Sequence, residues 1–86
     1  MKTLIELPNV GVELEKSLKR IGINTPEELI KAGTENVFIR IRTIDSTACI
    51  NLLYAIEGAI QGIRWHGLDS DRKQQLRAFF KTCNKL

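Results

Sequence analysis

Apolar residues recur along most of the chain with the three- and four-residue spacing of amphipathic helices. In the first such segment, Leu14, Leu18 and Ile21 fall on one face. Turn residues separate the segments, and no internal repeat or low-complexity tract interrupts them. The pattern predicts a compact all-α domain of five helices, at about residues 10–21, 26–32, 35–42, 46–61 and from 70 onwards.

Capping residues predict where these helices begin and end. Asn9 is placed to cap the first helix, and Gly22 closes it as a residue that tolerates positive φ. Thr25, with Pro26 at the first helical position and Glu28 reaching back, forms a capping box for the second. Thr34 is predicted to cap the third.

The third and fourth predicted helices differ in how clearly the sequence marks them. Residues 38–44 partly alternate between apolar and polar, so a strand competes with a helix there, and the flanking caps favour the helix. The fourth helix follows a cap at Asp45 or Ser46 and is apolar nearly all round, which predicts burial at the centre of a bundle. Gly58 and Ala55 would let a neighbouring helix pack closely, and Gly62 would lie at or past the helix end.

The last helix, capped by Asp69, carries two distinct faces. One face is apolar and comprises Leu76, Phe79, Phe80 and Cys83. The other is a basic stripe at four-residue spacing, comprising Lys73, Arg77, Lys81 and Lys85. The basic stripe fits either a nucleic-acid backbone or an acidic partner, and it equally fits a solvated helix back.

Composition limits the classes of function. A chain of 86 residues supports one small core and no deep substrate cleft, so we expect no enzyme and no small-molecule substrate. The net charge of +3 is weak evidence for nucleic acid. No segment has the length of a membrane span or the pattern of a signal peptide, which predicts a cytoplasmic protein without a membrane partner.

The cysteines and the single histidine give no metal-ligand pattern. Cys49 and Cys83 lie far apart in sequence, and a zinc site would need carboxylates to complete it. We therefore predict no metal and no cofactor, and free core thiols. Cys49 together with His66 could suggest a thiol nucleophile. Burial of Cys49 in the most apolar helix would disfavour the reactive thiolate form and so disable it.

The candidate binding residues with the best-defined geometry are Asn9, Val10 and Gly11. At a helix start, their backbone N–H groups could face a phosphate, and the alternative is a simple capped start packed on a neighbouring helix. Four cations could add electrostatic support: Lys2, Lys16, Lys19 and Arg20. Glu13 and Glu15 lie among them, and the spacing of Glu15 and Lys19 predicts an ion pair on a solvated face.

Four other residues carry both a structural and a functional reading. Trp65 and His66 could anchor a ligand, but we interpret them as structural, with the indole closing the core and the imidazole bonding to a turn. Arg40 and Arg42 are surface charges, or one of them pairs with Asp45.

Together these segments resemble a known family. The likeness lies in the Leu7-Pro8-Asn9-Val10-Gly11 start, the Arg64-Trp65-His66 connector and the intervening segments 22–29, 48–55 and 57–63. In this combination the chain resembles the C-terminal domain of the TfoX/Sxy competence regulators over nearly its whole length. That resemblance implies an all-helical, helix-hairpin-helix-like (SAM-like) domain and a link to competence regulation. Longer family members carry a further N-terminal domain, so this chain, starting at Met1, resembles a stand-alone version.

A more distant likeness is to the C-terminal domain of the RNA polymerase α subunit, which has a similar helix start that meets DNA in the minor groove. Carried over, that contact falls on Asn9, Val10 and Gly11. Asn9 replaces the first glycine of the commoner hairpin pattern, and too few residues precede Pro8 for a full first hairpin helix.

These observations lead to two alternative functions. The first is a non-catalytic regulatory module that binds duplex DNA or a DNA-bound part of the transcription machinery. The second is a protein-interaction or self-association module, for example a homodimer, formed through an apolar patch around Trp65 and Phe38.

Overall fold

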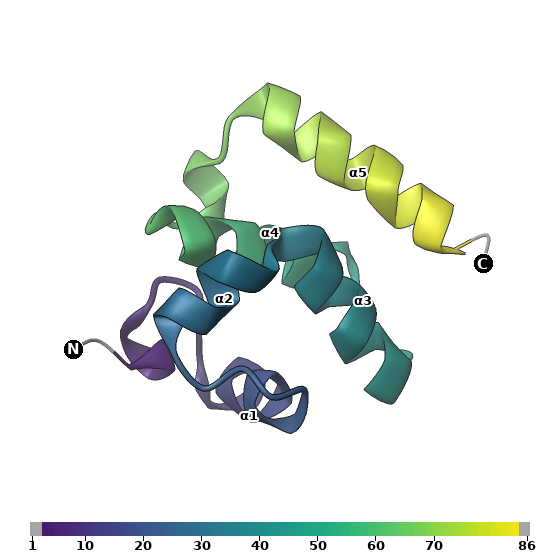
Figure 1. Cartoon of the computed structure of the whole chain (residues 1–86). Coiled ribbons are helices and arrows are strands. Elements are labelled where there is room, and N and C mark those ends of the chain that lie inside the picture. Colours follow the sequence, from purple (N-terminus) through teal and green to yellow (C-terminus); the bar gives the residue numbers. More distant parts are fainter. Residues whose placement is uncertain (1–2, 85–86) are drawn as a thin grey trace.

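Residues 3–84 are described by the computed structural model, and they form five α-helices and two short 3-10 helices (Figure 1). No strand occurs within that range, so the all-α prediction is confirmed, including a helix rather than a strand at 38–44. Lys2 and Lys85 lie outside the described residues. The elements in chain order are η1 (Leu4–Glu6), α1 (Val12–Arg20), α2 (Pro26–Ala32), α3 (Thr34–Ile44), α4 (Ile50–Gln61), η2 (Trp65–Gly67) and α5 (Ser70–Asn84).

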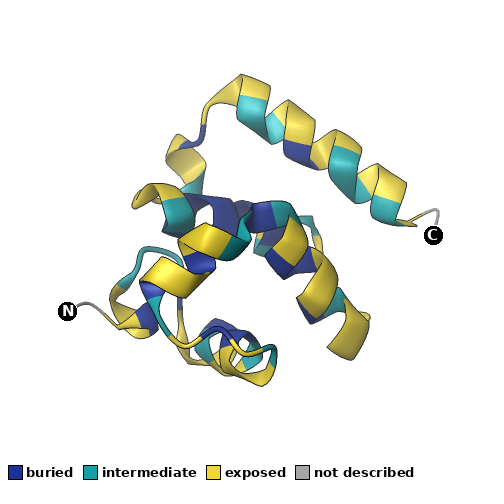
Figure 2. Ribbon diagram, viewed as in Figure 1, coloured by how far each residue is buried: buried dark blue, intermediate teal, exposed yellow. Residues whose placement is uncertain are grey.

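Helix α4 lies at the centre of the fold, with α2, α3, α5 and η2 packed against it (Figure 1). Half of its twelve residues are buried, and Figure 2 shows the resulting dark band through the middle of the molecule. The core around it is made of side chains with almost no exposed surface, such as Leu53, Phe38, Leu29 and Leu76. The apolar composition of this segment therefore predicted its central position correctly.

Several helix ends follow the sequence prediction. The Thr25 hydroxyl accepts a hydrogen bond from the Glu28 N–H at 3.1 Å, and the Glu28 carboxylate accepts one from the Asn24 N–H at 3.0 Å. Gly33 follows α2 with φ +85°, and Gly62 follows α4 in the left-handed conformation with φ +78°. Both glycines occupy backbone conformations that a side chain would strain.

The predicted start of α1 is wrong by two residues. The helix begins at Val12 with Gly11 in the capping position, and Asn9 does not cap it. Asn9 has φ +68°, the only positive φ outside glycine among residues 3–84, and its side chain bonds elsewhere. Within the described residues, the single 3-10 turn η1 lies before Pro8.

The caps predicted for α3 and α4 are also wrong. Thr34 lies inside α3, where its hydroxyl donates to the buried Glu57 carboxylate at 2.7 Å instead of capping. The Asp45 carboxylate accepts from the Thr47 N–H at 3.0 Å and from its hydroxyl, which holds a local turn and lowers the pKa of Asp45. The Asp45 carboxylate is bonded within this turn and so does not cap α4, which starts at Ile50.

The cysteines are both free, as predicted, but neither lies in the core. Cys49 is the residue before α4 and is exposed, and Cys83 on α5 is half-buried. The prediction that burial disables Cys49 is therefore wrong, because the helix that was to bury it begins one residue later.

Helix α5 is attached by an ionic network at its start and by aromatic contacts further along. The Arg72 guanidinium lies 2.8 Å from a Glu57 carboxylate oxygen and 3.0 Å from one of Glu35. Phe79 and Phe80 contact the buried ring of Phe38 edge-on, with ring centroids 6.4 and 5.8 Å apart. The apolar face predicted for this helix is therefore the face that packs, with Leu76 fully buried.

Glu57 is the one charged residue among the twelve of α4. Burial alone would raise its pKa, but hydrogen bonds from Arg72, Gln61 and Thr34 outweigh burial and hold the pKa below its ordinary value. The charged form of Glu57 is therefore the form that the folded state prefers.

This lowered pKa predicts a loss of stability in acid. The stabilising contribution is complete above the ordinary glutamate pKa of about 4.3 and disappears as the pH falls through the lower value of the folded state. We expect the free energy of unfolding, measured by urea titration, to fall between about pH 6 and pH 3, and to fall less in Glu57→Gln. The exposed control Glu27→Gln should keep the full decrease. An equal decrease in Glu57→Gln and the parent would contradict this assignment.

Candidate functional site

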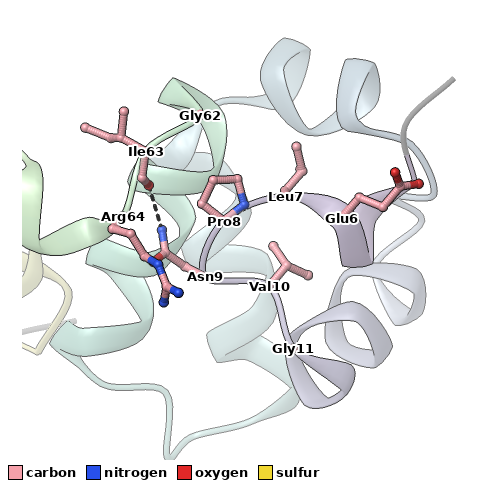
Figure 3. Close-up of a pocket in the computed structure, with 9 residues that line it drawn as sticks. All are labelled: Glu6, Leu7, Pro8, Asn9, Val10, Gly11, Gly62, Ile63 and Arg64. Atoms are coloured by element: carbon pink, nitrogen blue, oxygen red, sulfur yellow. Dashed lines mark hydrogen bonds between the residues drawn. The ribbon is translucent and has the colours of Figure 1, made fainter.

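The segment before α1 and the segment after α4 lie side by side and enclose an open hollow (Figure 3). Its volume is about 600 Å³, and it opens widely to solvent. Residues 6–11 line one side and residues 62–64 the other, so segments more than fifty positions apart in sequence meet here. The sequence-predicted residues Asn9, Val10 and Gly11 all border this hollow.

Asn9 holds the two segments together through its side-chain amide. Its Nδ2 donates to the Ile63 carbonyl at 2.9 Å and to the Ala55 carbonyl at 3.4 Å, and its Oδ1 accepts from the Trp65 N–H at 3.2 Å. Figure 3 shows the side chain pointing at Ile63, with Arg64 beside it. The amide is therefore engaged within the molecule, and Asn9 acts as a positioning residue for the hollow.

Gly58 makes room for this junction. A Cβ atom at Gly58 would lie 2.4 Å from Asn9 Nδ2 and 2.7 Å from the Ile63 carbonyl oxygen. The prediction that a neighbouring helix packs closely at Gly58 is wrong, because the neighbour is the Asn9 side chain with the 63–65 backbone. A backbone oxygen at this distance has little freedom to move, so only glycine fits.

Of the other two predicted residues, only Gly11 is accessible. The Val10 side chain is buried in the core, and its N–H bonds to the Leu7 carbonyl at 3.3 Å. Gly11 is exposed, stands at the start of α1 and has no atom within 4 Å of the position a Cβ would take. A ligand that approaches this loop would meet the Gly11 backbone and the first turn of α1.

The hollow is lined by one charge of each sign, Glu6 and Arg64, and α1 beside it carries further charges of both signs. Lys16 and Arg20 lie exposed on α1, and the predicted Glu15–Lys19 pair is present with Nζ and Oε2 3.9 Å apart. Glu13 is exposed in the first turn of α1, where it opposes an incoming anion. Arg64 lines the hollow from the far loop, and sequence reasoning missed it because its proximity depends on the Asn9 junction.

Trp65, His66 and the basic stripe, treated separately in the sequence, lie together in the structure. The Trp65 ring stacks near-parallel on Tyr54 with centroids 5.8 Å apart, and on His66 with centroids 4.0 Å apart. Lys73 Nζ lies 5.8 Å from the centre of the Trp65 ring, and Arg77 Nε lies 3.4 Å from the Tyr54 hydroxyl. Trp65 thus has the structural contacts expected of it, whereas His66 is exposed.

Arg40 and Arg42 bond to groups other than Asp45. Arg40 donates to the Ile21 carbonyl at the end of α1. Arg42 lies over the rings of Phe38 and Phe80 and donates to Asn84. Both arginines therefore join elements within the fold.

Two kinds of site can be considered within residues 3–84. No group of three or more His, Cys, Asp or Glu side chains in this range is arranged to hold a metal ion. No helix in the same range is long and apolar enough to cross a membrane.

Comparison with known families places the chain. The family model described as the TfoX C-terminal domain matches residues 1–80, and the chain therefore belongs to that family. Protein Sxy from Escherichia coli is 34% identical over 73 residues, covering 85% of this chain and 35% of Sxy. DNA transformation protein TfoX1 from Aliivibrio fischeri is 29% identical over 76 residues, covering 87% of this chain and 36% of TfoX1. The chain thus spans about a third of the length of these relatives.

Solved structures share the whole fold. A crystal structure of an uncharacterized protein from Listeria monocytogenes, in a triclinic form, is 48% identical with a TM-score of 0.95, covering 96% of this chain and 94% of that one. A tetragonal form of a Listeria monocytogenes protein of unknown function is 50% identical with a TM-score of 0.91, covering 93% and 98%.

The Asn9–Gly58 junction predicts that replacing Gly58 by alanine destabilises the fold, whereas helix propensity alone would predict that it stabilises α4. Gly58→Ala should destabilise the fold by about 1–3 kcal/mol, because the new Cβ displaces Asn9 and the Ile63 carbonyl, although alanine ordinarily favours a helix. Gly67→Ala, where no atom lies within 4 Å of the new Cβ, should change the free energy of unfolding by less than about 0.5 kcal/mol. Urea unfolding measures both. A Gly58→Ala variant as stable as the parent would show that the junction is not rigid.

Proposed function

We propose that this chain is a non-catalytic regulatory module of the TfoX C-terminal type that binds the backbone of duplex DNA, or a DNA-bound transcription partner, in the control of competence or a related process. The observation that carries the proposal is the family match over residues 1–80, with a relative named a DNA transformation protein. This chain spans about a third of the length of each relative, so a shared role in competence is proposed for it from the family match.

The hollow beside α1 supports a phosphate contact at one point. Gly11 leaves the start of α1 uncovered, so the N–H groups of the first turn and the positive end of the helix dipole face outward there. Arg64 adds a cation from the opposite loop, and Lys16 and Arg20 follow along the exposed side of α1. Asn9 and Val10 contribute by fixing the loop, because the Asn9 amide is engaged and Val10 is buried.

The proposal predicts localised, salt-sensitive binding. In an amide NMR titration with a short mixed-sequence duplex, resonances from Gly11 to Leu14 should shift at low salt and return as salt is raised. Gly11→Glu should abolish the shifts, because it places a carboxylate where the phosphate would lie, and Glu13→Gln should strengthen binding. Lys16→Gln should lower the slope of log affinity against log salt by about 0.9, and the exposed α2 control Lys31→Gln should not. Equal binding by Gly11→Glu would refute this site.

Self-association is the second candidate, and exposed apolar side chains favour it. Ile39 and Ile44 are 44% and 39% exposed on α3, and a small hollow of about 190 Å³ lies between Ile39, Arg42, Thr43 and Cys83. The patch first predicted around Trp65 and Phe38 is corrected, since Phe38 is fully buried. Removing exposed apolar surface of this kind from water favours association.

This candidate predicts a dimer that salt does not dissociate. Light scattering at increasing protein concentration should then report a mass that rises towards twice the monomer and is unchanged by salt. Ile39→Lys should return the chain to a monomer, and Ile30→Lys, a change at a more exposed isoleucine on α2, should leave the dimer intact. A strict monomer at high concentration would exclude self-association through this patch.

A further inference from the structure

A row of three aromatic rings runs from the core to the surface beside α5. Tyr54 is 6% exposed, Trp65 is half-buried and His66 is exposed, so the row ends in solvent. The rings are near-parallel, with interplanar angles of 14° between Tyr54 and Trp65 and 28° between Trp65 and His66. The arrangement positions an exposed imidazole on a rigid aromatic support.

Cations flank this row on the side of α5. Lys73 contacts the Trp65 ring and Arg77 the Tyr54 hydroxyl, and Lys81 follows one helical turn later and is exposed. Successive members of the stripe are therefore about 6 Å apart along the helix axis. From Arg72 to Asn84 the helix has no Asp or Glu, and the Glu57 carboxylate beneath it is paired with Arg72. In the face made by η2 and α5, residues 65–84, the carboxylates are Asp69 and Asp71, which precede the stripe, and the carboxylates that reach α5 from other helices, Glu35 and Glu57, are paired with Arg72.

We propose that this face is a binding site for single-stranded nucleic acid, with a base stacked on the His66–Trp65 pair and the phosphates following Lys73, Arg77 and Lys81. Sequence-tolerant binding of single strands combines aromatic platforms for bases with a positively charged track for the backbone. Both parts are present here, and they touch each other through the Lys73–Trp65 contact. The site shares no residue with the proposed duplex contacts at Gly11, Lys16, Arg20 and Arg64, and it does not depend on the duplex-binding proposal.

The aromatic row favours a single strand over a duplex or an acidic protein. Bases within a duplex are already stacked on their neighbours and have no free face for His66. An acidic protein would be attracted to the cations alone and would gain nothing from a stacked ring. Stacking of one base on an aromatic side chain raises the affinity by about five-fold or more, which makes its presence measurable.

Trp65 is the only tryptophan in the chain, so its fluorescence reports on this site directly. Titration of the whole chain with a short single-stranded oligonucleotide should quench the Trp65 emission. An abasic oligonucleotide of the same length, the matching duplex and poly-glutamate should each bind more weakly and quench less. Equal quenching by the abasic strand, the duplex or poly-glutamate would overturn the proposal, because each would reduce the face to a non-specific cation surface.

Variants separate the two parts of the site, with affinity measured by anisotropy of a labelled oligonucleotide. His66→Ala, an exposed change, should weaken binding roughly five-fold or more and leave the salt dependence unchanged. Lys81→Gln should lower the salt slope by about 0.7, while Lys31→Gln should behave like the parent. Lys16→Gln should also behave like the parent, so a failure here is distinguishable from a failure of duplex binding at Gly11. Unchanged binding by His66→Ala, or equal effects of Lys81→Gln and Lys31→Gln, would refute the site.

Discussion

The contact between the Asn9 side chain and Gly58 joins the segment before α1 to helix α4 and to the loop that follows α4. Asn9 donates to carbonyls of α4 and the following loop and accepts from the Trp65 N–H, so a single amide satisfies three backbone groups. The contact exists because Gly58 has no side chain and because Asn9 tolerates a left-handed backbone. The hollow beside α1, the position of Arg64 and the orientation of the Trp65 segment all follow from it.

A second constraint acts on the other side of α4, where the buried Glu57 carboxylate meets three elements. Thr34 of α3, Gln61 of α4 itself and Arg72 of α5 each donate to it. A charge in this position is tolerated only because these donors compensate for its loss of water. Glu57 therefore holds the first turn of α5 against α4. The position of this turn determines where Lys73 and Arg77 of the basic stripe lie relative to Trp65 and Tyr54.

The sequence predicted the number and type of helices well, because apolar periodicity and the 25–28 capping box are local signals. It misplaced the starts of α1 and α4, because Asn9 and Asp45 are strong capping residues whose side chains bond elsewhere. Asn9 bonds to groups more than forty positions away, and Asp45 bonds within its own turn. Residues 9–11 were predicted to be a capped helix start that either faces a phosphate or packs on a neighbour, and spacing could not show that the Asn9 side chain is bonded internally or that Val10 is buried. Nor could it show that Arg64, or the ring of Tyr54, lies beside the residues already selected.

The placement of Arg72 has a consequence for how the chain folds as it is synthesised. Domains acquire structure from the N-terminus as the chain emerges from the ribosome. The first four helices of this chain can gather around α4 before α5 has left the exit tunnel, yet Glu57 then lacks its cation and the core lacks Leu76. Without Arg72 and Leu76 the first four helices lack both the counter-ion of Glu57 and part of the core, which disfavours a stable packed state. Packing is therefore complete only after α5 has been released, so translation products truncated before Ser70 would be open substrates for proteases.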